Sequence, residues 1–240
     1  TDGIYFVLPD NSDSDERAEA MLAEIAAAMP AGIRLELDGK YPAMFSYKMK
    51  NYVLLDAAGE MTVRGSGLKS RGLERFQRRF MEDMFQLLMS DRHGELPALF
   101  AGYLDRIARH QLGIADLMKT ETLQDSLDNY RSKVGGGRRN LSAAYELALK
   151  SARGYIAGDQ ISYYVGGRGT RVKVSAAARL ASDYDPANPD ENVEYYQAKL
   201  AELFDKFKIF ATRPGLFAAS ELEPEVEDLQ QDFFADKSGN

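Results

Sequence analysis

The chain has 240 residues, 45% of them hydrophobic and 28% charged, which allows one large domain or two small ones with a proper core. It has no cysteine and only two histidines, so disulfides, thiolate sites and histidine-rich zinc sites are excluded. Any metal would be a hard ion such as Mg²⁺ held by carboxylates. Because no apolar stretch is long enough to span a bilayer and no signal peptide opens the chain, we expect a cytoplasmic protein without a membrane partner.

The charges are unevenly distributed along the chain. The net charge is −7, yet residues 40–79 carry nine basic residues against three acids. The acids gather elsewhere, with seven in residues 221–236 and no base among them. Such a distribution can attract phosphate to one surface of an acidic protein. The alternative, that each basic cluster is an ordinary solvated face, stays open at this point.

The first 90 residues predict an α+β part. An apolar run at residues 4–8 predicts a strand, and Ser12 or Asp13 can cap a helix that ends at Pro30. Short alternating segments follow at 33–37, 43–55 and 60–64, separated by glycines. We expect an antiparallel sheet with a helix on one face.

After residue 74 the apolar spacing becomes helical. Helices are predicted at 75–89, 96–112, 141–152 and 194–208, with one strand at 160–165. Glycine-rich loops interrupt this part at 135–139 and 166–169. We therefore predict an α+β fold with domains at 1–90 and 91–220, followed by an acidic, disordered tail at 221–240.

Three groups of residues are suited to phosphoryl-transfer chemistry or to binding nucleic acid. Asp2 lies in a turn before the first strand, where a carboxylate can reach a Mg²⁺ ion; a purely structural turn residue is the alternative. Lys48, Lys50 and Tyr52 share one face of a strand at period two, which suits a phosphate backbone, although an exposed sheet face explains them as well. A glycine-containing turn at 67–72 leads into a helix rich in arginine, which predicts an anion site built from Lys69, Arg71, Arg75, Arg78 and Arg79.

These motifs, in this order, resemble the family B DNA polymerases over residues 1 to about 210. That family has a D-T-D-S turn, a Leu-Glu strand, a K-K-x-Y motif and a K-G-I-E-x-x-R-R motif, and later a G-D-x-I-x-Y strand and a Tyr-Tyr helix. The corresponding strings here are Asp2; Leu35-Glu36; Met49-Lys50-Asn51-Tyr52; Arg71-Gly72-Leu73-Glu74 with Arg78; Gly158-Asp159-Gln160-Ile161-Ser162-Tyr163; and Glu194-Tyr195-Tyr196.

The resemblance implies a role for each region. Asp2 would be a ligand of both catalytic Mg²⁺ ions, with Glu36 near that site. Lys50 and Tyr52 would contact the minor groove of the primer–template duplex, and the arginines from Arg71 onward would hold primer phosphates. The first part would be the end of the palm and the helical part the thumb, whose 135–139 loop, with Arg138 and Arg139, would contact the DNA backbone.

The chain departs from the family pattern at three positions. Gly3 stands where serine is usual, so a hydroxyl is lost beside the metal site. Met49 replaces the first lysine of K-K-x-Y, and Gln77 replaces one arginine of the R-R pair. These differences predict a divergent branch of the family.

The tail contains a separate short motif. Gln230, Asp232, Phe233 and Phe234 lie in an otherwise acidic segment and resemble the peptide by which bacterial polymerases bind their sliding clamp. The alternative is that the two phenylalanines pack on the thumb.

The predicted function is template-directed DNA synthesis, in which dNTP is joined to the primer 3'-OH by a longer, nucleoid-associated polymerase. The second catalytic aspartate and the nucleotide-binding helix are expected upstream of Thr1, so we expect no synthesis by these 240 residues alone. Two alternatives remain: a non-catalytic duplex-binding module, and an unrelated α+β protein with solvated basic faces.

Overall fold

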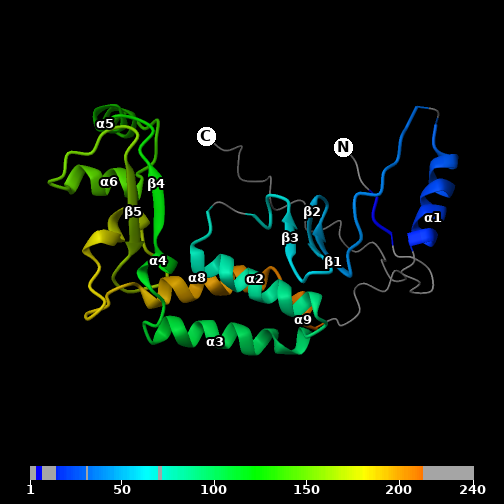
Figure 1. The fold of residues 1–240 in the computed structure, drawn as a ribbon. Helices are drawn as coiled ribbons and strands as arrows, with labels where there is room; N and C mark the ends of the chain where they lie inside the picture. Colours follow the sequence, from blue (N-terminus) through cyan, green and yellow to red (C-terminus); the bar gives the residue numbers. More distant parts are fainter. Residues whose placement is uncertain (1–3, 7–14, 31, 70–71, 213–240) are drawn as a thin grey trace. The chain divides into compact units, whose positions relative to one another are not determined.

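The computed structural model describes residues 4–6, 15–30, 32–69 and 72–212, and it has the predicted α+β composition (Figure 1). The chain divides into two compact units. The first unit comprises Thr1–Met44 and Leu54–Thr62, and the second comprises Phe45–Val53 and Val63–Asn240. Asp2, Arg71 and the predicted tail, including the clamp motif, lie outside the described residues.

The first unit contains helix α1 (Asp15–Ala28), close to the predicted helix. Its first turn carries Asp15, whose Oδ1 atom accepts a hydrogen bond of 2.6 Å from Lys40 Nζ. Two predicted strands of this unit are wrong: residues 33–37, and residues 4–6 of the strand predicted at 4–8, are not strands in the structure, and residues 7–8 lie outside the described residues. A segment forms a strand only where a neighbouring strand supplies hydrogen bonds, and neither described segment joins a described sheet.

Strands β1 (Ala43–Lys48), β2 (Asn51–Leu55) and β3 (Met61–Arg64) form a three-stranded sheet in that order. The prediction of a strand at 60–64 is confirmed, whereas the segment 43–55 is two strands joined by a turn at Met49 and Lys50. Lys50 has φ of 62°, in the left-handed region. Because strands require negative φ, β1 cannot continue through this residue. In the second unit, Phe45 of β1 packs its ring 5.6 Å from Phe85 and 4.8 Å from Phe210.

The second unit has a helical layer of α2 (Arg75–Met89), α3 (Leu96–Ala108) and α8 (Val193–Asp205), with the short helix α9 (Ile209–Thr212) and the 3₁₀ turn η2 (His93–Glu95) (Figure 1). The helix predicted at 75–89 is confirmed with both its ends. Its apolar spacing buries one face, and Phe80 contacts the rings of Phe100, Tyr103 and Phe204 at 5.3 to 6.3 Å. Aromatic packing therefore joins the three helices.

The second unit also contains an antiparallel sheet of β4 (Lys119–Thr122), β5 (Gln160–Val165) and β6 (Ala178–Leu180), in that order. The sequence predicts only β5. Helices α5 (Leu127–Gly135) and α6 (Ala143–Lys150) belong to this part, with the short elements α4 (Ile114–Leu117), α7 (Val174–Ala177) and η3 (Ala181–Asp183).

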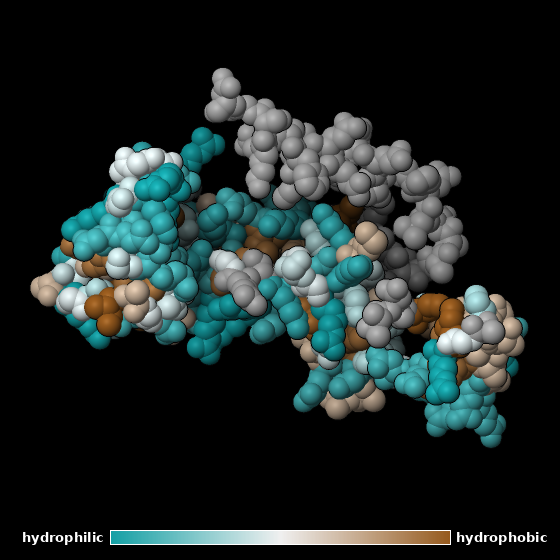
Figure 2. Space-filling model, turned by 90° about the horizontal axis from the view of Figure 1, so that it is seen from above, coloured by the Kyte–Doolittle hydropathy of each residue, from teal (hydrophilic) through white to brown (hydrophobic). Residues whose placement is uncertain are grey.

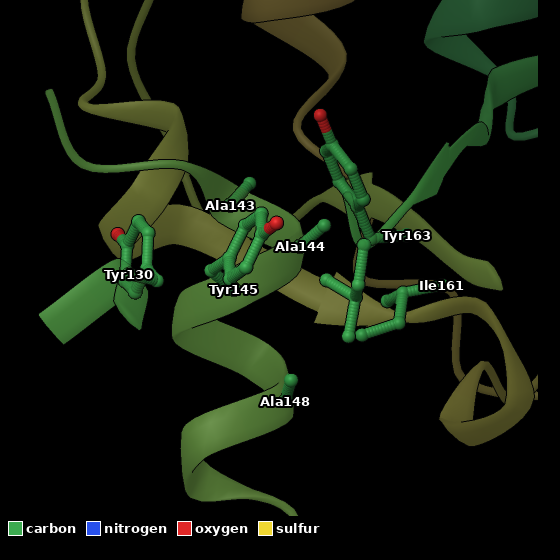
Figure 3. Packing of buried hydrophobic residues seen from close by; sticks show 8 residues of the cluster. Tyr130, Ala143, Ala144, Tyr145, Ala148, Ile161 and Tyr163 are labelled. Atoms are coloured by element: carbon green, nitrogen blue, oxygen red, sulfur yellow. The ribbon is translucent and has the colours of Figure 1, made fainter. Parts of the chain in front are cut away.

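The core beneath this sheet is shown in Figure 3. Helix α6 presents the small side chains of Ala144 and Ala148, which let it lie close to Ile161 and Tyr163 of β5. The rings of Tyr130 and Tyr145 stack with their centres 4.3 Å apart. The mixed packing of small and aromatic residues fixes α5 and α6 on the sheet.

The predicted domain boundary near residue 90 stays a prediction. Among the described residues, no helix is both long and apolar enough to cross a membrane.

Candidate nucleic-acid interface

The turn between β1 and β2 places two of the predicted DNA-binding lysines at an exposed tip. Lys48 ends β1 and Lys50 lies in the turn, and both side chains are exposed. Lys48 Nζ lies 5.3 Å from the centre of the Tyr47 ring, and Lys50 has no ion-pair partner among the described residues. Both ammonium groups are therefore available to an anion.

The predicted common face of Lys48, Lys50 and Tyr52 is wrong. The period-two argument requires one continuous strand, but the turn at Met49 and Lys50 interrupts it. Tyr52 lies in β2 and is half-buried, whereas Lys48 and Lys50 are exposed. The three residues lie close in sequence, but they do not form the flat strip that the spacing predicts.

The predicted arginines of α2 differ in their surroundings. Arg79 Nη1 donates a hydrogen bond of 2.8 Å to Asp116 Oδ2 in α4, and Arg75 Nε lies 3.6 Å from Asp116 Oδ1. Asp116 is buried, so these arginines neutralise a carboxylate that would be costly to leave alone. Arg78 is exposed and has no such partner in the described part of the chain. Lys69 is also exposed, in the turn before α2.

Gln77 is tied to the start of α2. Glu74 is the N-cap of the helix and forms a capping box with Gln77, whose Oε1 accepts a bond of 3.2 Å from the Glu74 N–H. The Gln77 amide also donates a bond of 3.1 Å to the Lys199 carbonyl oxygen in α8. The glutamine therefore performs a structural task at this position.

The two arginines of the glycine-rich loop after α5 also differ in their exposure and in their partners. Arg139 is half-buried: its guanidinium lies 4.4 Å from the centre of the Tyr145 ring, and Nη1 bonds Asp125 Oδ2 at 2.9 Å. Lys133 bonds the same carboxylate, and this hydrogen bond lowers the pKa of Asp125 below its usual range. Arg138 is exposed and has no ion-pair partner among the residues described.

A cluster of lysines that the sequence argument overlooks surrounds a cavity of about 210 Å³ beside the start of α2. Lys119 of β4 pairs with Glu74 at 3.2 Å, and Lys199 of α8 pairs with Glu202 at 2.9 Å. The side chain of Lys206 has no ion-pair partner among the described residues. These lysines are 87 positions apart at most, so no local pattern could have grouped them.

The described residues do not by themselves form a metal centre. No three acidic or histidine side chains converge within the part of the chain that the structure describes. Glu36 is exposed in the first unit, and Asp2 lies outside the described residues. The predicted roles of Asp2 and Glu36 therefore stay predictions.

On the face shown in Figure 2, hydrophilic side chains predominate and hydrophobic ones are scattered.

No family model matches the chain. It is, however, 26% identical over 199 residues to a DNA polymerase of Thermococcus aggregans, which covers 82% of this chain and 10% of that protein. It is also 22% identical over 201 residues to a DNA polymerase of Pyrococcus glycovorans, covering 82% of this chain and 25% of that protein. The family B DNA polymerase of the archaeon Pyrobaculum calidifontis has the same fold over 85% of the chain, with a TM-score of 0.61 and 19% identity.

The chain is related to the family B DNA polymerases. It spans between 10% and 25% of the length of these relatives. The family recognition made from the motifs is thus confirmed.

Proposed function

We propose that this chain supplies the duplex-binding part of a family B DNA polymerase, which joins dNTP to a primer 3'-OH under direction of a template. The similarity to archaeal DNA polymerases over 82% of the chain carries this proposal. It is supported by the cations at the β1–β2 tip, on α2 and in the loop after α5, which remain exposed and available to phosphate.

Five of the predicted DNA-binding residues are the strongest candidates for contacts with phosphate. Each is exposed and has no ion-pair partner among the described residues; they are Lys48, Lys50, Lys69, Arg78 and Arg138. Arg75, Arg79 and Arg139 are held in ion pairs, so we assign them mainly to the stability of the fold. Arg71 remains part of the proposal and lies outside the described residues.

Binding of a short primer–template duplex to the chain, measured by fluorescence anisotropy over a range of salt concentrations, tests this function. Affinity should fall as salt rises, because cations that contact phosphate release counterions. Arg78→Gln or Arg138→Gln should each reduce the slope of log K against log salt by about 0.9, the value for one phosphate contact. Arg92→Gln is the matched control, because Arg92 is an exposed arginine already paired with Glu95 at 2.6 Å.

Two outcomes would contradict the proposal. Absence of duplex binding at low salt would show that the basic clusters are ordinary solvated faces. An affinity that does not depend on salt would show that the exposed cations do not contact phosphate.

Asp2 is proposed as a ligand of two Mg²⁺ ions, with Glu36 nearby. Its carboxylate would supply one of the oxygen ligands that such ions require, and the ions would supply charge stabilisation at the reacting phosphate. Asp2→Asn in the polymerase that contains this chain should abolish synthesis while leaving duplex affinity intact. Near-normal synthesis would instead favour a non-catalytic duplex-binding module. The expectation that these 240 residues alone incorporate no dNTP stays a prediction, checked by primer extension.

The tail residues Gln230, Asp232, Phe233 and Phe234 are proposed to bind a sliding clamp. The pattern of one glutamine and two adjacent phenylalanines suits a peptide that docks in an apolar pocket. The double variant Phe233→Ala with Phe234→Ala should weaken binding to the clamp and leave binding to DNA unchanged. Equal clamp affinity of the variant and the natural chain would end this proposal.

A further inference from the structure

Helices α2 and α3 form a hairpin with an open hollow between them. α2 ends at Met89 and α3 begins at Leu96, and the two helices lie side by side within the second unit (Figure 1). The α2–α3 hollow has a volume of about 330 Å³ and is lined by Asp83, Gln86, Leu87, Glu95, Ala98 and Leu99. The three residues before the turn and the three after it both have the spacing i, i+3 and i+4, so each helix contributes one turn of one face.

The surface of this hollow is mainly apolar, and two of the described residues that line it are acidic while none is basic. Ala98 is exposed, and its small side chain leaves the space between the helices open. Asp83 accepts a hydrogen bond of 2.6 Å from the Tyr103 hydroxyl, but it has no ion-pair partner among the described residues. Glu95 is paired with Arg92 at 2.6 Å. Asp83 therefore carries the main uncompensated charge beside the apolar surface.

The charge of α2 changes sign along the helix. Residues 75–79 contain three arginines, among them the proposed DNA-binding residue Arg78, whereas residues 80–91 contain three acids and no base. The hollow lies beside the acidic part, to which Asp83 belongs. An acidic surface repels phosphate and attracts cations. The hollow is therefore suited to a basic partner and not to nucleic acid.

We propose that the α2–α3 hollow binds a basic amphipathic helix of a partner protein. Apolar residues one turn apart on that helix pack against Leu87, Ala98 and Leu99, and a lysine or arginine lies beside Asp83. A helix suits a gap between two helices, because its ridges of side chains pack into the grooves of its neighbours. Amphipathic helices are recognised in this way, through apolar anchors at i and i+3 or i+4. The inference does not depend on the duplex binding proposed above.

The chain itself offers poorer occupants for the hollow. Residues 221–236 carry seven acids and no base, so the acidic part of α2 repels this segment. The arginine-rich part of α2 in a second copy is basic, but Phe76 and Phe80 on its apolar face are already buried in its own core. Charge and the availability of an apolar face therefore both favour a different protein.

A pair of model peptides tests the chemistry of the partner. The probe is a fluorescein-labelled peptide of leucine and lysine with helical spacing, and its control is the same peptide with glutamate in place of lysine. Fluorescence anisotropy with the whole 240-residue chain should show saturable binding of the lysine peptide. The glutamate peptide should bind about tenfold more weakly or not at all, because it brings like charges together.

Filling the hollow tests the place of binding. Ala98→Leu should weaken binding of the lysine peptide about tenfold, because an apolar anchor loses its site. Ala101→Leu is the matched control: Ala101 is also an exposed alanine of α3, but it does not line the hollow, so affinity should change less than about twofold. Leucine and alanine both favour helices, so circular dichroism should show both variants folded. Duplex affinity should be the same in both.

Changing the charge at Gln86 tests the electrostatic part of the proposal. Gln86 is an exposed residue of the lining, so substitutions there should leave the fold intact. Gln86→Glu should strengthen binding of the lysine peptide about twofold to fivefold, and Gln86→Lys should weaken it by a similar factor, as expected for one exposed ion pair gained or one repulsion added.

Three outcomes would overturn the proposal. Equal binding of the lysine peptide to the natural chain and to Ala98→Leu would show that the peptide is held elsewhere, for example by the acids of residues 221–236. Equal affinity for the lysine and glutamate peptides would show that charge does not select the partner. Self-association in sedimentation experiments that Ala98→Leu abolishes would show that the occupant is a second copy of this chain.

Discussion

Arg138 and Arg139 are neighbours in sequence, yet their side chains have different surroundings. Arg138 is exposed, whereas Arg139 lies over the rings of Tyr145 and Tyr130 and pairs with Asp125. A basic pair in a glycine-rich loop predicts two backbone contacts to DNA. The structure instead indicates that one arginine faces solvent while the other holds the loop against α5 and α6.

The pair can be separated by substitution. Arg139→Ala should lower the free energy of unfolding by about 1 kcal/mol, because a cation stacked on aromatic rings is lost. Arg138→Ala should leave the free energy of unfolding within about 0.5 kcal/mol of its original value. Urea unfolding followed by circular dichroism measures both. Equal losses from the two variants would contradict the different surroundings that the structure gives them.

Gln77 shows how a departure from a family motif acquires a structural explanation. The sequence alone presents it as the loss of one arginine from an R-R pair. In the structure its side chain closes the capping box with Glu74 and reaches the Lys199 carbonyl oxygen in α8. A guanidinium cannot accept a hydrogen bond, so arginine could not complete the capping box at this position.

At the scale of whole elements, Tyr196 connects the helical layer to the second sheet. Its hydroxyl accepts a bond of 2.8 Å from the Val165 N–H in β5 and donates one of 3.1 Å to the Leu117 carbonyl oxygen in α4. The side chain is almost fully buried, and its ring contacts Phe76 of α2 at 5.8 Å. One side chain thus satisfies backbone groups of two elements that are far apart in sequence.

Tyr196→Phe should therefore lower the free energy of unfolding by about 1 to 3 kcal/mol, because buried backbone groups lose their partner. Thermal and urea unfolding measure the change. Tyr155→Phe is the control: Tyr155 is half-buried, its hydroxyl has no partner among the described residues, and the change should stay within about 0.5 kcal/mol. A Tyr196→Phe variant as stable as this control would show that the hydroxyl contributes nothing.

The elements also show where sequence patterns are reliable. Helix α2 was predicted with both ends because its apolar spacing is strong and a glycine turn precedes it. β4 and β6 were missed because they are only four and three residues long, and because all four residues of β4 are polar, so it shows no alternation of apolar and polar residues. The strand predicted at 33–37 was wrong for the opposite reason: the alternation is present, but no described strand pairs with it.

At the scale of the whole molecule, buried and half-buried tyrosines make the free energy of unfolding depend on pH in the alkaline range. Burial, together with the hydrogen bond to Glu191, raises the pKa of Tyr184 to about 12. Burial, with the nearby charge of Glu74, raises the pKa of Tyr195 to about 12. Burial also raises the pKa of Tyr103, Tyr163 and Tyr196. In the unfolded chain a tyrosine ionises near pH 10.

The sign of the effect follows from these pKa values. Below about pH 10 the tyrosines are neutral in both states, so their contribution to stability is fully present. As pH rises from about 10 to about 12, the unfolded chain loses phenolic protons that the folded chain keeps, and the free energy of unfolding falls. Phenolate absorbance and circular dichroism, followed together, should show the buried tyrosines ionising as the protein unfolds. Complete ionisation near pH 10 with an unchanged dichroism spectrum would contradict this expectation.

The sequence by itself determined the α+β class, the main helices, strand β5 and the relation to family B DNA polymerases. Local periodicity and capping residues are properties of neighbouring residues, and the short motifs are recognised by their order along the chain. None of these features depends on which distant residues are in contact. Only the tertiary structure decided which cations are held in ion pairs. It also placed Lys48 and Lys50 beside Met49 at a hairpin tip. It further showed that Gln77 and Tyr196 join distant elements. These properties depend on partners far along the chain, such as Asp116 for Arg79, and on the reversal of the backbone at Lys50, which a period-two pattern does not reveal.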